Sequence, residues 1–181
     1  MNEMIRPAQA HEVEAVAQGY ERLFDREEQT GSATNWRRGV YPTRATAQNA
    51  FEKGWLYVLL DDAGCVCASM ILNHEQPQDY ARLDWRFPAG AEETLVLHTL
   101  CVDPAQTGRG YGSRMVRFLL EHARRTGMRA VRLDTYEGNA PAAGLYRRLG
   151  FRYAGSLEML HEGVIPETLI CFEIAVGNED K

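Results

Sequence analysis

The chain has 181 residues, 45% of them hydrophobic, and a formal net charge of -5 at pH 7. This length and hydrophobic share predict a single domain, residues 1–181, that can bury a substantial core. The acidic balance disfavours nucleic acid or an anionic membrane as the main partner. No apolar run is long enough to predict a membrane span.

The first half of the chain predicts a short strand, two helices and a β-hairpin: residues 4–6, 13–24, 43–51, and 55–60 with 65–72. The first helix follows from apolar residues at helical spacing, and the second from Thr43 as N-cap and Gly54 as stop. The polar residues 25–36 between them predict an irregular connection. Residues 73–93 form a long polar and aromatic connection, and loops of this length are usually functional or disordered.

The second half of the chain predicts four strands at residues 94–102, 130–135, 151–157 and 168–175. A long amphipathic helix is predicted from Gly112 to a stop at Gly127, and a short helix from Asn139 as N-cap to Gly150 as C-cap. The last two strands are expected to be joined by a turn that contains glycine and proline.

The most informative stretch joins the strand at residues 94–102 to the long helix. It contains Gly108, Gly110 and Gly112, which lack the Cβ atoms that would keep a phosphate away from the backbone. Unpaired amides and the positive end of the helix dipole converge there. Residues 101–152 carry ten arginines against four acidic residues, a local charge of about +6 (10 − 4). We therefore expect a phosphorylated ligand at this loop.

The loop matches neither of two common phosphate-binding motifs. A P-loop ends in Gly-Lys-Ser/Thr, and residues 54–180 contain no lysine. A dinucleotide fingerprint needs a third Gly or Ala where this chain has Ser113 or Arg114. The stretch Thr107-Gly108-Arg109-Gly110-Tyr111-Gly112 instead resembles the motif Arg/Gln-x-x-Gly-x-Gly/Ala of the GNAT superfamily of acetyl-CoA-dependent N-acetyltransferases. Thr107 departs from that motif, which removes one side-chain contact and leaves the backbone amides in place.

A second motif extends the resemblance. The stretch Asn139-Ala140-Pro141-Ala142-Ala143-Gly144-Leu145-Tyr146-Arg147-Arg148-Leu149-Gly150-Phe151 is similar to the later motif of the same superfamily, Asn-x-x-Ala-x-x-Leu-Tyr-x-x-Leu-Gly-Phe. A lone tyrosine at position 146 would be read as a core aromatic. Both motifs in order, with a strand between them, favour the family interpretation.

The resemblance implies an α/β (α+β) fold whose mixed, mostly antiparallel central sheet is splayed between its middle strands and flanked by helices. It also implies transfer of an acetyl group from acetyl-CoA to a primary amine of a small molecule or a peptide. The cofactor-binding residues that it implies are Leu100, Cys101 and Val102 for the pantetheine arm, Gly108, Arg109, Gly110, Tyr111, Gly112 and Ser113 for the diphosphate, and Asn139.

The same resemblance implies Tyr146 as general acid, because a phenol with a pKa of about 10 stays protonated at neutral pH. For the general base the sequence leaves Asp134, Glu93 and His98 open. Asp134 holds the position where some relatives that act on protein N-termini carry a catalytic glutamate. The aromatic residues expected at the acceptor pocket, which could equally be buried packing, are Trp36, Tyr41, Tyr80 and Trp85.

Acidic residues outside the basic segment favour a cationic amine as acceptor: Glu27, Glu28, Glu75, Asp79 and Asp84. Four cysteines without C-x-x-C spacing, and a start without a signal-peptide pattern, predict reduced thiols and a cytoplasmic protein. No His, Cys or carboxylate cluster has metal-ligand spacing, so no metal is expected.

Two other functions stay open on the sequence alone. One is a non-catalytic acyl-CoA-binding sensor or regulatory protein on the same fold, and the other is a nucleotide-binding protein. The sequence indicates neither the acceptor amine, nor the acyl length, nor the oligomeric state, and a homodimer is compatible with it.

Overall fold

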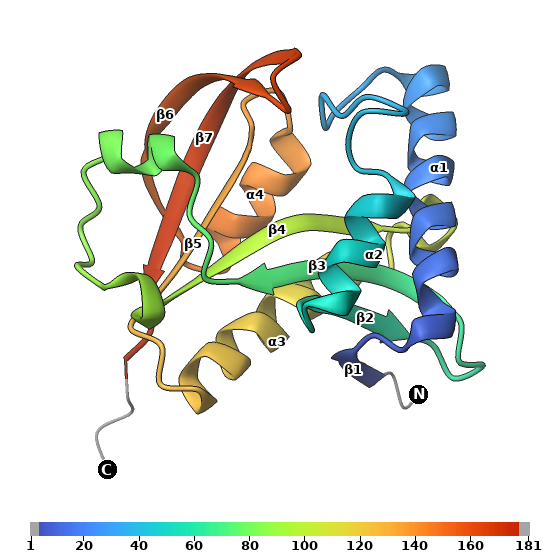
Figure 1. The fold of residues 1–181 in the computed structure, drawn as a ribbon, viewed down its shortest axis with the longest axis horizontal. Coiled ribbons are helices and arrows are strands. Elements are labelled where there is room, and N and C mark those ends of the chain that lie inside the picture. Colours follow the sequence, from blue (N-terminus) through green and yellow to red (C-terminus); the bar gives the residue numbers. More distant parts are fainter. Residues whose placement is uncertain (1–3, 178–181) are drawn as a thin grey trace.

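The computed structural model describes residues 4–177, which form a seven-stranded sheet with helices on both faces (Figure 1). The strands are β1 (Met4–Pro7), β2 (Leu56–Leu60), β3 (Val66–Asn73), β4 (Thr94–Val102), β5 (Ala130–Tyr136), β6 (Arg152–His161) and β7 (Ile165–Ala175). The helices are α1 (Val13–Thr30), α2 (Arg44–Glu52), α3 (Tyr111–Arg125) and α4 (Ala140–Arg148).

The strand order is β1-β2-β3-β4-β5-β7-β6, and every neighbouring pair is antiparallel except β4 with β5, which are parallel. The helices α1 and α2 bury their apolar sides on one face of the sheet. The helices α3 and α4 cover the other face. This arrangement confirms the fold class predicted from the sequence. Between Met4 and Gly177, no helix combines the length and the apolar character that crossing a membrane requires.

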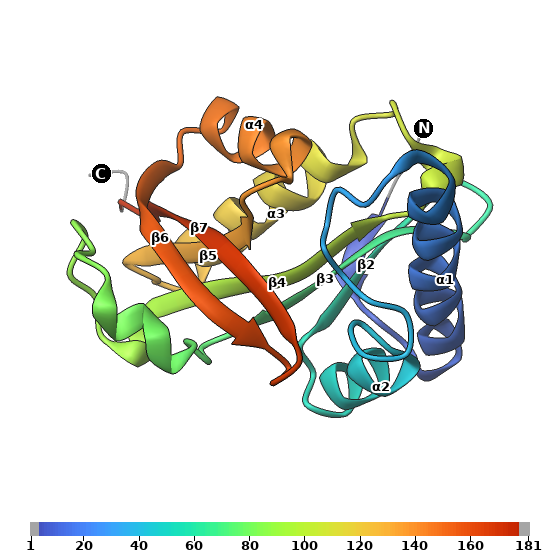
Figure 2. The same cartoon turned by 90° about the horizontal axis from the view of Figure 1, so that it is seen from above.

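The sheet is splayed between β4 and β5. These strands pair only from Thr94 with Ala130 to Leu97 with Leu133. β4 then continues to Val102, whereas β5 follows β7 as far as Tyr136. Figure 2 shows the two strands diverging beyond their paired segment. The predicted splay is confirmed, and it leaves the facing edges of both strands without a partner in the sheet.

A β-bulge lies in β4 where the splay begins. Ile71 of β3 faces His98, but Ser69 faces Cys101, so β4 holds one more residue than β3 over this segment. Thr99 in the bulge has a positive φ of 50°. The bulge reverses the alternation of side chains, because Leu97 before it and Leu100 after it both pack toward α3.

Two elements are longer than predicted. Residues 25–30 were expected to be irregular but continue α1, because their charged side chains make contacts that hydrophobic periodicity does not record. Arg38 forms ion pairs with Glu21, Asp25 and Glu28 along this exposed side. Glu27 ends the helix by accepting hydrogen bonds from the amides of Ala33 and Thr34, at 3.1 and 3.0 Å.

The hairpin formed by β6 and β7 also extends past its predicted limits. Residues 158–161 and 165–167 were expected in the connection, yet they pair across the hairpin up to His161 with Ile165. Pro166 is tolerated there because this end of β7 pairs with β6 alone, so the missing N–H can face away from the ladder. The longer hairpin carries polar side chains toward the splayed strands.

The long connection at residues 73–93 is held against the sheet by two buried charged residues. Arg132 of β5 donates to Gln76 Oε1 at 2.6 Å and to the carbonyl oxygen of Phe87 at 3.2 Å. Glu173 of β7 is fully buried and accepts hydrogen bonds from the amides of Arg86 and Phe87, at 2.8 and 3.2 Å. These contacts give the connection, which has little regular structure, a defined path.

We predict that Glu173→Ala lowers the free energy of unfolding by about 3 kcal/mol, because it leaves the amides of Arg86 and Phe87 without their acceptor and removes the partner of Arg152 at 3.1 Å. Urea denaturation measures this loss. The control is Glu158→Ala on the exposed side of β6, which should stay within about 0.5 kcal/mol of the parent protein. Equal losses in the two variants would contradict the assigned role of Glu173.

Candidate functional site

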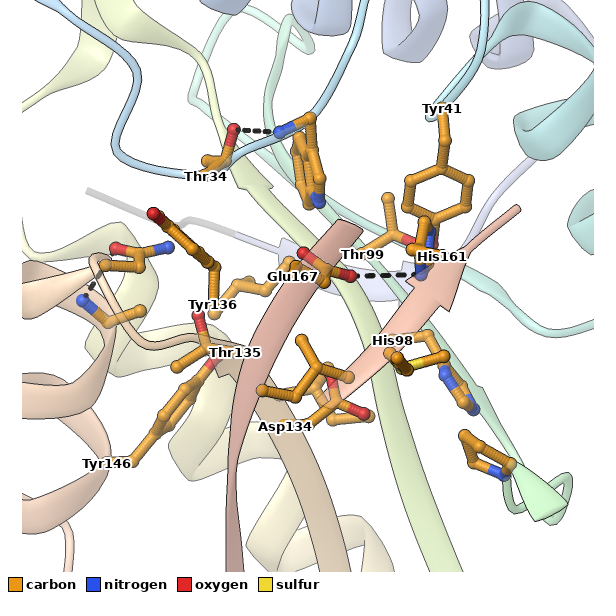
Figure 3. A pocket seen from close by; sticks show the side chains of 18 residues that line it. Thr34, Tyr41, His98, Thr99, Asp134, Thr135, Tyr136, Tyr146, His161 and Glu167 are labelled. Atoms are coloured by element: carbon orange, nitrogen blue, oxygen red, sulfur yellow. Dashed lines mark hydrogen bonds and ion pairs between the residues drawn. The ribbon is translucent and has the colours of Figure 1, made fainter. Parts of the chain in front are cut away.

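A cavity of about 150 Å³ lies between the parted strands (Figure 3). β4 contributes Leu97 to Leu100, β5 contributes Asp134 to Tyr136, and α4 contributes Tyr146. The connection between α1 and α2 and the β6–β7 hairpin close the other side. The residues that they supply to the wall are Thr34, Trp36, Tyr41, Met159, His161, Glu167 and Leu169.

The glycine loop ends at the first turn of α3, where Gly110 is the N-cap. Within residues 4–177, the backbone amides of residues 108–113 donate to no other part of the chain. Gly108 and Gly110 have φ values of 85° and 77°, which favour glycine. A Cβ on Gly112 would lie 3.3 Å from Leu145 Cδ2. This cradle of free amides at a helix N-terminus fits a diphosphate.

Two arginines from α1 support this loop. Arg22 donates two hydrogen bonds to Asp103 Oδ2, at 2.6 and 2.9 Å. Arg26 Nη1 donates to Thr107 Oγ1 at 3.0 Å. A guanidinium therefore lies at the position where the motif normally has Arg or Gln and this chain has Thr107. Sequence reasoning missed Arg26, because it lies 81 residues from Thr107 and no local pattern connects them.

The side chains of the predicted cofactor-binding residues lie in different surroundings. Leu100 and Val102 pack toward α3 on the parted edge of β4, and Cys101 is buried against the α1 and α2 face. The side chain of Tyr111 is buried in the core. The side chain of Arg109 is exposed, and that of Ser113 is half-buried. Most of these residues can therefore contact a ligand only through their main chain. Asn139 lines the cavity, and its side-chain oxygen caps α4 by accepting from Ala142 N at 3.2 Å.

Tyr146 lies in the cavity wall and belongs to α4, the helix whose Leu145 packs at Gly112. Its ring contacts Phe151 and Phe172. Burial, and secondarily the charge of Asp134, raises the pKa of Tyr146. The phenol is therefore protonated at neutral pH and can donate its proton.

Asp134 is half-buried in the cavity wall and accepts a hydrogen bond from the hydroxyl of Tyr80 at 2.7 Å. Burial raises the pKa of Asp134, against the opposing effects of the Tyr80 hydrogen bond and of His98 and His161. Tyr80 and Trp85 do not line this cavity. Trp85 packs behind Tyr80 and donates to its carbonyl oxygen at 2.9 Å. Of the four predicted aromatic residues, Trp36 and Tyr41 therefore form the wall.

The two other sequence candidates for a base have different environments. His98 lines the cavity, and its Nε2 lies 2.9 Å from Asn73 Oδ1 and 3.1 Å from the carbonyl oxygen of Glu75. Because both partners accept, Nε2 donates and Nδ1 holds the lone pair in the neutral ring; burial lowers the pKa of His98. Glu93 precedes the paired end of β4, where it forms an ion pair with Arg129 at 3.3 Å.

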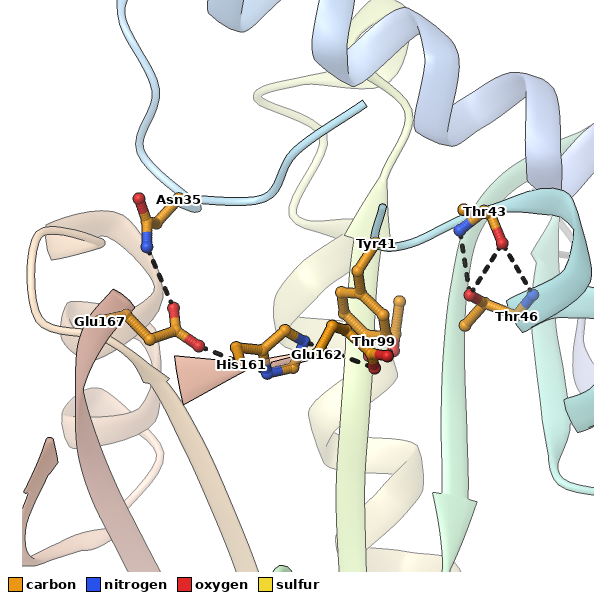
Figure 4. Close-up of polar contacts among 8 residues, drawn as sticks. All are labelled: Asn35, Tyr41, Thr43, Thr46, Thr99, His161, Glu162 and Glu167. Atoms are coloured by element: carbon orange, nitrogen blue, oxygen red, sulfur yellow. Dashed lines mark hydrogen bonds and ion pairs between the residues drawn. The ribbon is translucent and has the colours of Figure 1, made fainter. Parts of the chain in front are cut away.

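A polar group on the β6–β7 hairpin completes the wall and was not foreseen from the sequence. His161 Nδ1 lies 3.4 Å from Glu167 Oε1, and Asn35 Nδ2 donates to Glu167 Oε2 at 3.3 Å (Figure 4). The Tyr41 ring meets the His161 ring at 4.5 Å, and its hydroxyl is hydrogen-bonded to that of Thr99. The sequence offered only a weak signal for this group, which was the presence of His161 and Glu167 as polar residues on either side of the turn at Gly163.

The acidic residues cited for a cationic acceptor mostly have partners elsewhere. Glu27 caps the end of α1, and Glu28 pairs with Arg38. Glu75 lies 3.7 Å from Lys53, and Asp79 lies 3.1 Å from Arg82. The carboxylates that line the cavity are instead Asp134 and Glu167.

Neither a metal-ligand group nor a disulfide is present among residues 4–177. Across residues 4–177, His, Cys, Asp and Glu side chains form no group of three or more that could hold a metal ion. Cys65, Cys67, Cys101 and Cys171 are all free thiols.

Comparison with known proteins identifies a family. The model of the acetyltransferase (GNAT) family matches residues 16–151. The methionine sulfoximine/methionine sulfone acetyltransferase of Pseudomonas aeruginosa is 38% identical over 74 residues, 41% of this chain and 42% of that protein. The N-alpha-acetyltransferase RimI of Mycobacterium tuberculosis is 44% identical over 59 residues, 33% of this chain and 35% of that protein. The matches thus span less than half the length of these relatives.

Solved structures share the fold over nearly the whole chain. A GNAT-family acetyltransferase of Streptococcus agalactiae has a TM-score of 0.81 at 18% identity, covering 98% of this chain and 96% of that one. The protein yncA of Salmonella typhimurium, solved with its cofactor acetyl-CoA, has a TM-score of 0.68 at 20% identity. That match covers 100% of this chain and 98% of that one. At these identities the likeness concerns the fold.

We predict that Asp134→Asn changes how stability depends on pH. Because the pKa of Asp134 is raised in the folded chain, its contribution to stability is complete below the unfolded value of about 3.9 and is lost as pH rises through the folded value. The variant lacks this loss, so its free energy of unfolding relative to the parent should increase from pH 4 to pH 8. Urea denaturation across that range tests it, with the exposed Asp84→Asn as control. A constant difference would contradict the prediction.

Proposed function

The chain belongs to the GNAT acetyltransferase family, and on that premise we propose that it transfers the acetyl group of acetyl-CoA to a primary amine of a small molecule or peptide. The observation that carries this proposal is the set of free amides at residues 108–113, beside parted strands that enclose a cavity with Tyr146 in its wall. A diphosphate held by these amides would direct the attached thioester into the cavity.

The residues suit acetyl-CoA as cosubstrate. The amides of residues 108–113 would hold the diphosphate, and Arg26 adds a positive charge beside them. The unpaired edge of β4 from Leu100 to Val102 would accept the amide-bearing pantetheine arm as an additional strand. Asn139 lies near this path, at the start of α4. The Salmonella typhimurium neighbour with its acetyl-CoA supports the choice of ligand.

The chemistry assigns one clear task to Tyr146. The amine nitrogen attacks the thioester carbonyl, the carbon–nitrogen bond forms, and the carbon–sulfur bond breaks. Tyr146 would donate its phenolic proton to the departing sulfur, because its raised pKa keeps the proton in place at neutral pH. Backbone amides at the parted edge would stabilise the negative charge on the carbonyl oxygen. The carboxylates of the cavity wall that are available to the incoming ammonium are Asp134 and Glu167.

The names of the relatives do not indicate one particular acceptor. Their names specify L-methionine sulfoximine or L-methionine sulfone, an N-alpha position, and streptothricin. They share acetyl transfer and differ in what receives the acetyl group. We propose that Trp36 and Tyr41, whose rings lie 6.0 Å apart, form the wall against which the acceptor packs.

The decisive experiment is thiol release from acetyl-CoA with a panel of amines, followed by mass spectrometry for the added acetyl group. Release with at least one amine supports the proposal. Binding of acetyl-CoA without release would favour a non-catalytic sensor. Stabilisation by ATP or NAD and not by acetyl-CoA in a thermal-shift assay would favour a nucleotide-binding protein.

Gly110→Ala should weaken acetyl-CoA binding by about tenfold or more, because a Cβ disfavours the left-handed backbone that aims the amides. Isothermal titration calorimetry with acetyl-CoA measures the change. The matched control is Gly64→Ala in the exposed β2–β3 turn, whose φ of 79° imposes the same strain away from the loop. Equal affinity in both variants would remove the support for a diphosphate site at Gly110.

Tyr146→Phe should lower kcat/KM roughly 100-fold, because the thiolate then departs without a proton donor, while the dissociation constant of acetyl-CoA stays unchanged. Steady-state kinetics with the best amine of the panel tests this. Tyr153→Phe is the control, since that exposed hydroxyl lies on β6 and contacts Ser156. Unchanged turnover of Tyr146→Phe at saturating substrate would exclude the acid role.

A further inference from the structure

An amine acceptor arrives as an ammonium ion and must lose a proton before it can attack. On the premise of the proposed function, we infer that Glu167 receives this ammonium and takes its proton. Its neighbours His161 and Asn35 hold the carboxylate in place. This assignment differs from the candidates that the sequence offers, which are Asp134, His98 and Glu93.

Glu167 lies where an acceptor would enter. Its side chain is 5% exposed and lines the cavity between the parted strands. It also lines an open groove on the neighbouring surface, together with Tyr136 and Met159, which belong to both. Figure 3 shows the carboxylate pointing into the cavity from β7. Glu167 therefore lies where this groove meets the cavity, whereas a second groove meets the cavity at Tyr41, His98 and Thr99.

The carboxylate of Glu167 and the phenol of Tyr146 reach the cavity from different elements. Tyr146 comes from α4, and Glu167 comes from β7 (Figure 3). Glu167 contacts Asn35 and His161, and the latter packs against Tyr41 on the connection between α1 and α2. The reaction needs two such groups, because the acid must reach the sulfur while the base must reach the nitrogen on the other side of the carbonyl carbon.

The contacts of Glu167 are few and long for a buried carboxylate. Within the described part of the chain they are Asn35 Nδ2 at 3.3 Å and His161 Nδ1 at 3.4 Å. A buried carboxylate with weak partners is costly, so an ammonium ion placed beside it is strongly favoured. No lysine or arginine lines the cavity in residues 4–177 to compete for it.

The environment also makes Glu167 a better base than an exposed glutamate. Burial raises the pKa of Glu167, with the negative charge of Asp134 on β5 acting in the same direction. Asn35 and His161 on β6 oppose this rise. The opposing influences leave a carboxylate that accepts a proton more readily than an exposed one and can release it again to water.

The other candidates have less suitable environments. Asp134 accepts a hydrogen bond of 2.7 Å from Tyr80, which is shorter than either contact of Glu167. His98 has only Nδ1 to accept a proton, because Nε2 donates to Asn73 and Glu75, and burial lowers the pKa of the ring. Glu93 is paired with Arg129 near the other end of β4.

In the balanced step, Glu167 accepts one proton from the ammonium, the nitrogen attacks the thioester, and the sulfur leaves with the proton of Tyr146. The new amide nitrogen then gives its second proton, through water, to the Tyr146 phenolate, and the proton on Glu167 passes to water.

The test is the pH dependence of kcat/KM with an amine from a panel of spermidine, methionine sulfoximine and a peptide with a free N-terminus. An alkylamine has a pKa of about 10.4, and the α-amine of a peptide has a pKa of about 8. Without a base in the protein, only free amine reacts, and kcat/KM rises tenfold per pH unit up to the pKa of the amine used. With Glu167 as base, kcat/KM reaches a plateau once the carboxylate is ionised.

We expect the parent protein to show the plateau and Glu167→Gln to lose it. At pH 7 the variant should have roughly 100-fold lower kcat/KM, and the deficit should shrink as pH rises and the amine loses its proton unaided. Glu167→Asp should keep a plateau at reduced rate. The control Glu121→Gln removes an exposed charge from α3, away from the cavity, and should retain the parent profile. Unchanged affinity of Glu167→Gln for acetyl-CoA would verify its fold.

The outcomes separate two failures. No thiol release by the parent protein with any amine contradicts the proposed function, and the role of Glu167 with it. Turnover by the parent protein with an unaltered plateau in Glu167→Gln overturns the role of Glu167 alone. Loss of the plateau in Asp134→Asn and its retention in Glu167→Gln would assign the base to Asp134 instead.

Discussion

The structure depends on one constraint, which is that β4 and β5 stop pairing at Leu97 and Leu133 although both strands continue. Buried main-chain groups normally find hydrogen-bond partners, so an unpaired stretch inside a sheet is costly unless something fills it. Here the gap lies beside the helices α3 and α4 on one face of the sheet, and residues of the β6–β7 hairpin form the opposite wall. The same parting that weakens the sheet provides room for a chain-like ligand with its own amide groups.

The cavity also concentrates ionisable groups that would be more stable in water. Asp134 and Glu167 have raised pKa values because burial disfavours their charged forms. Burial raises the pKa of the Tyr146 phenol for the same reason. The two carboxyl groups therefore lower the stability of the fold at neutral pH, whereas Tyr146 is protonated there in both the folded and the unfolded state. Their presence in one wall is the usual signature of a site where protons are moved. The core around α3 and the contacts of Glu173 supply stability away from the cavity.

The sequence predicted most of the fold and part of the site, because those features are encoded over short stretches. The glycine loop, the N-caps Thr43 and Asn139, and the alternating strands each follow from local residue types. The end of α1 and the length of the hairpin did not, since charged contacts and not hydrophobic periodicity define them. Glu167 was missed for a related reason, since its position beside Asn35 results from a contact 132 residues apart in the chain.

The bulge in β4 has a consequence for how this segment can change. In a regular strand Leu97 and Leu100 would lie on opposite faces, but the extra residue near Thr99 brings both toward α3 and leaves Cys101 on the α1 and α2 face. Deleting one residue there would turn Leu100 and Val102 toward the wrong helices and move the start of the glycine loop. The number of residues in this strand is therefore more tightly constrained than their identity, so that conservative exchanges are tolerated where a single-codon deletion is not.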